Sequence, residues 1–208
     1  MTVRMSMDPD SLDLADFRSS IDRAVEVFSA AGDDVGLARA YQQHGFVSAM
    51  LAKWGDMEKP MRKAIELAGR TGSYAIQDRA MDWLGHAIYY GPTPIPEAIE
   101  QFENLAEMSG SAIRLAHIQA RISGLKAALG NFDEARRDIE QAERVFTEMK
   151  ANFLLAELPF LKGDVHFWSE DLEAGIRDLT EGVERLIEGG GNAFAFYAAM
   201  MFLQLLWA

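Results

Sequence analysis

The residues of this chain that could carry out chemistry do not form a recognisable catalytic pattern. Its histidines fall at unrelated points of the sequence, and none has the HExxH spacing that helical zinc sites use: His44, His86, His117 and His166. With 32 acidic residues, neighbouring carboxylates such as Asp33 and Asp34 are expected on solvated helix faces, so they do not indicate acid–base catalysis. No serine has the G-x-S-x-G context of a nucleophile, and there is no cysteine. We therefore expect no enzyme activity, no cofactor and no metal site.

Composition and charge narrow the classes of partner. The 208 residues carry a formal net charge of −12, whereas a nucleic-acid-binding protein needs a basic face. The absence of cysteine is typical of proteins in a reducing cytoplasm, and the first ten residues do not resemble a signal peptide. Segment 193–208 is uncharged but shorter than the roughly 20 residues of a membrane span. These observations predict a cytoplasmic protein that binds neither nucleic acid nor a membrane.

The elements that would position any functional residue follow from one helical pattern, which returns about every 40 residues. Small or apolar residues lead each copy, at Phe17, Met57, Ala98, Ala135 and Gly175. Four residues further on come Ile21, Met61, Phe102, Ile139 and Leu179, so each copy has one apolar helix face. A second series precedes these helices, at Gly45, Gly85, Ser123 and Gly163. Two registers with the same period predict two helices per repeat, that is, an all-α solenoid without strands.

This pattern predicts about ten helices in a single domain, 11–208, after a loose leader, 1–10. The predicted order is a half repeat at 11–31, four helix pairs between 35 and 188, and a half repeat at 192–208. The pairs are 35–52 with 54–69, 73–90 with 94–109, 111–129 with 132–149, and 152–168 with 170–188. Two interpretations of the unpaired ends stay open: the sequence is a segment of a longer protein, or its last helix docks on another chain.

Three local features refine these boundaries. Asn131, followed by Glu134, is predicted to cap the helix after it, and Ser169 to cap the helix at 170. Pro60 would be costly inside a helix, so we expect its helix to begin near Asp56 or to kink.

The small residues of the two series resemble the tetratricopeptide (TPR) pattern. Gly45, Gly85 and Gly163 match its eighth position, with Ser123 as a substitute, and Ala64, Ala142 and Gly182 match its twenty-seventh. Ala98, Ala135 and Gly175 match the twentieth, whereas Met57 and Leu105 depart from the pattern. The resemblance implies a right-handed superhelix of antiparallel helix pairs. Phrases such as "ALGNFDEARRDIEQAERVF" also resemble the TPR region of bacterial signalling proteins that join a class III adenylate or guanylate cyclase to an AAA-type ATPase.

The same resemblance implies a concave face lined by the first helix of each pair. The residues that would line it are of mixed chemistry: Arg39, Gln42, Phe46, Arg79, Asp82, His86, Tyr89, His117, Arg121, Asp164 and Phe167. Apolar anchors with polar edges are suited to a peptide or a helix. The leading hypothesis is a non-enzymatic protein–protein interaction scaffold, a regulatory or sensory arm whose partner is a protein, a peptide or another domain of its own polypeptide.

Two other hypotheses stay open. One is a small-molecule sensor pocket around His86, Tyr89, His117 and Arg121. The other is self-association through the apolar segment 192–208.

Overall fold

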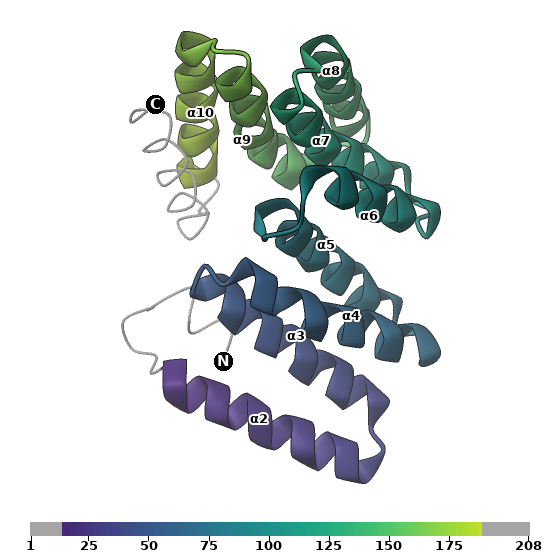
Figure 1. Cartoon of the computed structure of the whole chain (residues 1–208). Coiled ribbons are helices and arrows are strands. Elements are labelled where there is room, and N and C mark those ends of the chain that lie inside the picture. Colours follow the sequence, from purple (N-terminus) through teal and green to yellow (C-terminus); the bar gives the residue numbers. More distant parts are fainter. Residues whose placement is uncertain (1–13, 189–208) are drawn as a thin grey trace. The chain divides into compact units, whose positions relative to one another are not determined.

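The computed structural model describes residues 14–188, and this part of the chain is built of α-helices without a strand (Figure 1). The all-α prediction is therefore confirmed for the described residues. The helices are α2 (Leu14–Ala31), α3 (Asp34–Met50), α4 (Trp54–Arg70), α5 (Tyr74–Tyr90), α6 (Ile95–Glu107), α7 (Ala112–Ala128), α8 (Phe132–Glu148), α9 (Asn152–Trp168) and α10 (Leu172–Glu188). The predicted leader 1–10 and the predicted helix 192–208 lie outside the described residues.

The chain divides into two compact units, Met1–Ala98 and Ile99–Ala208. In the first unit α2 packs on α3, α3 on α4 and α4 on α5, and α3 also contacts α5. In the second unit α7 packs on α8, α8 on α9 and α9 on α10, and α7 also contacts α9. In both units these helices thus pack on their neighbours in sequence, and one pair of alternate helices is also in contact: α3 with α5, and α7 with α9.

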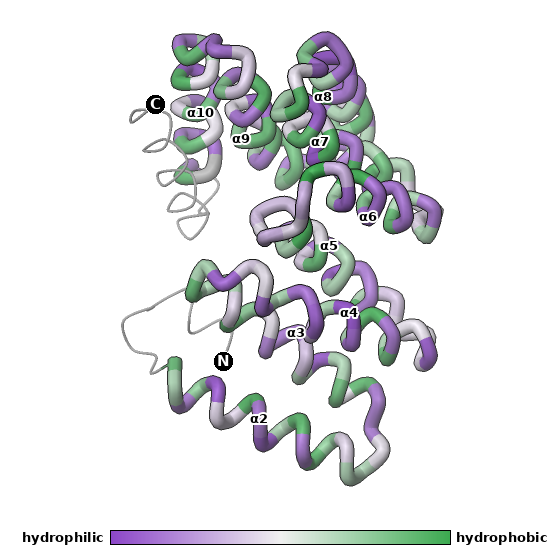
Figure 2. Tube along the Cα trace, viewed as in Figure 1, coloured by the Kyte–Doolittle hydropathy of each residue, from purple (hydrophilic) through white to green (hydrophobic). Residues whose placement is uncertain are grey.

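Helices α2, α4 and α8 bury one face each, as their sequence pattern predicts, whereas α7 buries consecutive residues from Ala120 to Leu125. Figure 2 shows hydrophobic and hydrophilic residues interspersed along α2, where Phe17 and Ile21 are the buried ones. Ile21, Met61, Phe102, Ile139 and Leu179, the apolar set predicted from the repeat, are all nearly inaccessible to solvent. The core therefore consists of the residues that recur with the repeat.

Small residues lie where helices approach most closely. Gly45 of α3 lies against Met57 and Met61 of α4, and Gly163 of α9 lies against Leu179 of α10. Met61 and Leu179 stand at the same spacing after Gly45 and Gly163, so the two pairs cross at equivalent points. A Cβ atom at Gly163 would be 3.1 Å from Cγ of Leu179, which explains why a larger residue is disfavoured there.

The turns between helices share one hydrogen-bond pattern. In six of them, one residue has a positive φ: Gly32, Ala52, Gly72, Gly130, Lys150 and Glu170. The N–H group of the next residue then donates to a carbonyl five residues back, as in Lys53 N to Ser48 O at 2.8 Å and Ser73 N to Ala68 O at 2.9 Å. This is the Schellman arrangement, which satisfies the last carbonyl groups of a helix. The repeat is therefore visible in the turns as well as in the helices.

The helix start predicted from Pro60 was wrong. Helix α4 begins at Trp54, not near Asp56, and Pro60 is buried inside it. The tight turn at Ala52 follows the end of α3 directly. The indole of Trp54 packs on Tyr90 of α5 with ring centroids 5.3 Å apart, so a tertiary contact favours the start of α4 at Trp54.

Of the two predicted caps, Asn131 is at the predicted position and Ser169 is not. Ser169 ends α9, whereas α10 begins at Leu172, where Asp171 Oδ1 accepts from Ala174 N at 3.3 Å. Asn131 holds the N-cap position of α8, but its side chain makes no capping hydrogen bond.

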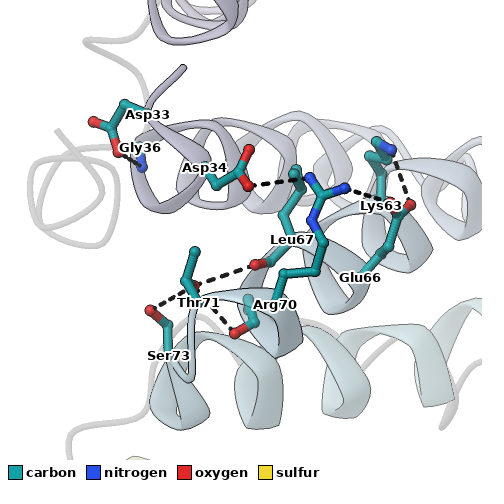
Figure 3. A network of polar contacts seen from close by, with 10 residues as sticks. Asp33, Asp34, Gly36, Lys63, Glu66, Leu67, Arg70, Thr71 and Ser73 are labelled. Carbon is teal, nitrogen blue, oxygen red and sulfur yellow. Dashed lines mark hydrogen bonds and ion pairs between the residues drawn. The ribbon is translucent and has the colours of Figure 1, made fainter. Parts of the chain in front are cut away.

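A polar network joins the start of α3 to the end of α4 (Figure 3). Arg70 donates to Asp34 at 3.1 Å and to Glu66 at 3.4 Å, and Lys63 donates to Glu66 at 2.8 Å. The hydrogen bond from Lys63, against an opposing effect of desolvation, lowers the pKa of Glu66, with the charges of Lys63 and Arg70 adding to the effect. All four side chains are solvent-accessible, so this network contributes little to stability.

Candidate interaction surface

Aromatic side chains of α3, α4 and α5 form one continuous row in the first unit. We call it the aromatic row; it consists of Phe46, Trp54, Trp83, His86, Tyr89 and Tyr90. Phe46 meets Trp83 edge-on at 5.5 Å, and Trp83 lies 5.2 Å from the imidazole of His86. Tyr90 then contacts His86 at 6.2 Å and Tyr89 at 4.8 Å. Most of these rings are half-buried and Tyr90 is 37% exposed, so the row keeps apolar area that a partner could cover.

Charged side chains accompany the aromatic row on two of its three helices, α3 and α5. Arg39 of α3 and Arg79 and Asp82 of α5 are exposed. Neither arginine forms an ion pair within the described residues, and both retain guanidinium groups for an acidic ligand. The backbone oxygen of Asp82 lies 3.1 Å from Nδ1 of His86, which holds that ring beside Trp83. Apart from Gln42, the predicted lining residues of this unit are therefore accessible or half-buried.

Gln42 is placed differently from its neighbours in the predicted surface. It is only 7% exposed, and its Nε2 donates to the backbone oxygen of Ile76 at 2.6 Å. This bond joins α3 to α5. The side chain of Gln42 is thus engaged in holding two helices together.

In the second unit, two predicted residues converge on a largely buried carboxylate. Arg121 is 3% exposed and its guanidinium lies 3.4 Å from Oε1 of Glu157. His117 Nε2 lies 3.3 Å from Oε2 of the same carboxylate, so the cluster joins α7 to α9. Because a carboxylate taken out of water is costly without a partner, these contacts are part of the packing of the unit. The other two predicted residues, Asp164 and Phe167, are half-buried on α9, and Phe167 meets Trp168 at 5.2 Å.

The four residues of the small-molecule hypothesis divide between the units. His86 and Tyr89 belong to the aromatic row of the first unit, whereas His117 and Arg121 belong to the cluster at Glu157. That hypothesis remains a prediction.

Trp83 and Tyr90, which link the other rings, were not predicted from the sequence. Each stands one position from a predicted lining residue, on the same helix. A repeat position assigned from one sequence does not distinguish a wide helix face from a narrow one. A signal did exist, since Trp83, His86 and Tyr90 follow the i, i+3, i+7 spacing of one face.

Two further side-chain contacts, a Lys–Asp ion pair and a His–Asp contact, cross-link helices in the second unit at equivalent points of the repeat. Lys126 of α7 lies 2.8 Å from Asp138 of α8, and His166 of α9 lies 3.2 Å from Asp178 of α10. Burial lowers the pKa of Lys126, but the hydrogen bonds and charges of Asp138 and then Glu134 outweigh it, so the pKa is raised. Each pair links the first helix of a predicted hairpin to its second.

No protein-family model and no curated protein matches this sequence. Within residues 14–188, no three histidine or carboxylate side chains are grouped as metal ligands. None of the helices described between these residues combines the length and the apolar character needed to cross a bilayer.

Proposed function

We propose that the chain is a non-enzymatic protein–protein interaction scaffold, built as a TPR-like right-handed solenoid, that binds an extended peptide or a helix on the aromatic row. The observation that carries the proposal is the row itself. It joins α3 and α5 through ring contacts and leaves aromatic area exposed, and the same two helices carry the exposed Arg39 and Arg79, which have no ion pair among the described residues.

The repeating construction of the helices supports the solenoid part of the proposal. Equivalent glycines mark equivalent crossings, six turns share one backbone conformation, and alternate helices contact each other in both units. Repeat proteins of this type present extended surfaces rather than enclosed catalytic sites.

The chemistry of the row indicates the kind of segment it would bind. Half-buried aromatic rings are suited to apolar or aromatic anchors, and such anchors dominate the energy of protein interfaces. Arg39 and Arg79 favour acidic residues beside the anchor. We therefore expect a ligand segment with one or two large apolar residues flanked by Asp or Glu. A regulatory role in a bacterial signalling protein rests on the sequence resemblance alone.

Selection of peptides tests the proposal whatever the natural partner is. A phage-displayed random 12-residue library would be panned on the immobilised chain, and selected peptides would be titrated by isothermal calorimetry. We expect peptides with acidic residues beside apolar anchors. Combining Arg79→Glu with Tyr89→Ala should weaken them at least tenfold, because it removes one anchor contact and reverses one charge.

A matched pair of changes away from the row serves as the control. Arg137 and Tyr74 are exposed, on α8 and at the start of α5, so Arg137→Glu with Tyr74→Ala makes the same chemical changes elsewhere. This variant should bind the selected peptides as the wild type does. Equal affinity of the wild type and the Arg79→Glu, Tyr89→Ala variant would show that the row is not the binding surface.

A further inference from the structure

A hollow lies among α2, α3 and α4 in the first unit. Its volume is about 480 Å³, within the range of sites that hold small molecules. Part of its wall is apolar, formed by Ile21, Val47, Leu51 and Pro60. None of the predicted groove residues lines it.

The rest of the wall carries an excess of positive charge. Arg18, Lys53 and Lys59 line the hollow, and Asp56 is its one carboxylate among the described residues. None of the three cations forms an ion pair with another described residue, although the whole chain carries a net charge of −12. His44 also lines the hollow, and its Nδ1 is buried without a hydrogen-bond partner in residues 14–188. A buried polar atom of this kind is usually satisfied, by protein, water or a ligand.

Comparison of the repeats shows why the hollow exists. In the second unit, the equivalent point between paired helices is closed by Lys126 with Asp138 and by His166 with Asp178. The two residues of each pair stand 3 and 15 positions after Ser123 or Gly163. The residues 3 and 15 positions after Gly45 are Ser48 and Pro60. They cannot form an ion pair, and the hydroxyl of Ser48 instead donates to the backbone oxygen of His44 at 3.4 Å. The α3–α4 hairpin therefore lacks the cross-link that the α7–α8 and α9–α10 hairpins have at this point.

Backbone polarity adds to the positive character of the hollow. Gly55 and Asp56 belong to the first turn of α4, and the amide group of Asp56 donates to the backbone oxygen of Lys53 at 3.1 Å. The N-cap residue, Lys53, supplies no side-chain capping bond. The positive end of the helix dipole and three cations without an ion pair to another described residue favour an anion at this place.

We propose that this hollow binds a small organic anion, a carboxylate or phosphate monoester whose short apolar body lies on Ile21, Val47 and Pro60. The charged head contacts Lys53, Lys59 and Arg18 at the rim. This site does not depend on the proposed peptide-binding function, because it shares no residue with the aromatic row.

The experiment uses octanoate and octyl phosphate as probes, with 1-octanol as the neutral analogue and inorganic phosphate as the head alone. Binding to the full chain is followed by ¹H–¹⁵N NMR titration. We expect saturable shifts centred on the amides of Ser48, Gly55 and Lys59 with at least one octyl anion, and weaker binding of both 1-octanol and phosphate. Absence of saturable shifts with both octyl anions, or equal binding of 1-octanol, would overturn the proposal. Equal binding of phosphate alone would also overturn it, because the apolar wall would then contribute nothing.

Two sets of variants locate the site. Lys53→Glu with Lys59→Glu should weaken binding roughly tenfold or more, since it removes charge-assisted hydrogen bonds to the head group. Arg137→Glu with Arg177→Glu changes the net charge equally at exposed positions elsewhere and should leave binding unchanged. An equal loss of affinity in both double variants would refute a local site and indicate only the effect of net charge.

A third variant closes the hollow. Ser48→Lys with Pro60→Asp introduces the Lys–Asp pair that the α7–α8 hairpin has, and it should abolish binding if circular dichroism shows an unchanged helix content. Full binding by this variant with its helix content intact would refute the assignment of the site to the hollow. The variant Arg79→Glu with Tyr89→Ala should bind the octyl anions normally, which separates failure of this proposal from failure of the peptide-binding proposal.

Discussion

Replacing Gly182 by alanine should weaken the packing of α9 on α10, although alanine is the better helix former. A Cβ atom at Gly182 would lie 2.7 Å from Cβ and 3.1 Å from Cγ of Pro159. Both proline atoms are fixed by the ring and the backbone, so no rotamer change relieves the clash. The helices themselves must move apart.

The size of the effect follows from this geometry. Carbon atoms pack at about 3.5–4.0 Å, so relief of the clash requires a separation of about 1 Å. Overpacking of this kind costs about 1–3 kcal/mol, whereas alanine in place of glycine stabilises a helix by about 1 kcal/mol. We expect the free energy of unfolding to fall by about 0–2 kcal/mol after both effects.

Gly69 provides the matched control. It lies in the last turn of α4, is exposed, and its added Cβ would meet only the flexible end of Gln77, at 3.1 Å. Gly69→Ala should therefore gain about 0.5–1 kcal/mol. Urea titrations followed by far-UV circular dichroism should separate the two variants by about 0.5–3 kcal/mol.

A larger residue sharpens the test. Gly182→Leu keeps a good helix former but adds more volume, and it should be less stable than Gly182→Ala. If Gly182→Ala is stabilised as much as Gly69→Ala, helices α9 and α10 do not approach closely at this point, and the assignment of small residues to helix crossings is wrong.

Three other outcomes follow from the packing. Pro60→Ala should raise the free energy of unfolding, measured by urea titration, by about 1–2 kcal/mol. Proline inside a helix costs about 3 kcal/mol, which exceeds the packing energy of the ring atoms that the change removes. A decrease would show that the ring is needed at that position. Glu157→Gln should lower the free energy of unfolding by about 3 kcal/mol, since the buried Arg121 then lacks this countercharge. Adding Arg121→Met should restore part of the stability. An unchanged free energy of unfolding in the single variant would contradict the buried pair. Burial lowers the pKa of Lys126, but the contacts with Asp138 raise it by more, so the pKa in the folded state is raised. The pair therefore stabilises the fold fully below the unfolded pKa of about 10.4, and this stabilisation is lost as the pH rises through the folded pKa. Urea midpoints measured from pH 8 to 11 should therefore fall more steeply for the wild type than for Lys126→Met; parallel curves would exclude the effect.

The sequence predicted the helices of the described region because their apolar residues recur at i, i+4 and i+7 with one period. It also predicted the crossings at Gly45 and Gly163, since two helix axes approach closely only where a side chain is small. The repeat also predicted the start of α4 at residue 54, and only the later start near Asp56, expected because of Pro60, was wrong. Trp54 begins α4 because of its contact with Tyr90, and nothing local to residues 54–60 reveals that contact.

The candidate surface shows the same division. Residue types and helix positions were enough to place His86 and Tyr89 on one face of α5, because helical spacing is a local property of the chain. Only the tertiary structure decided that Gln42 donates a hydrogen bond to Ile76 and that Arg121 pairs with Glu157. The burial of both side chains depends on which residues the neighbouring helices place against them. The hollow beside Pro60 also depends on tertiary structure, because it lies among three helices, α2, α3 and α4. Their packing leaves this space where Ser48 and Pro60 form no ion pair.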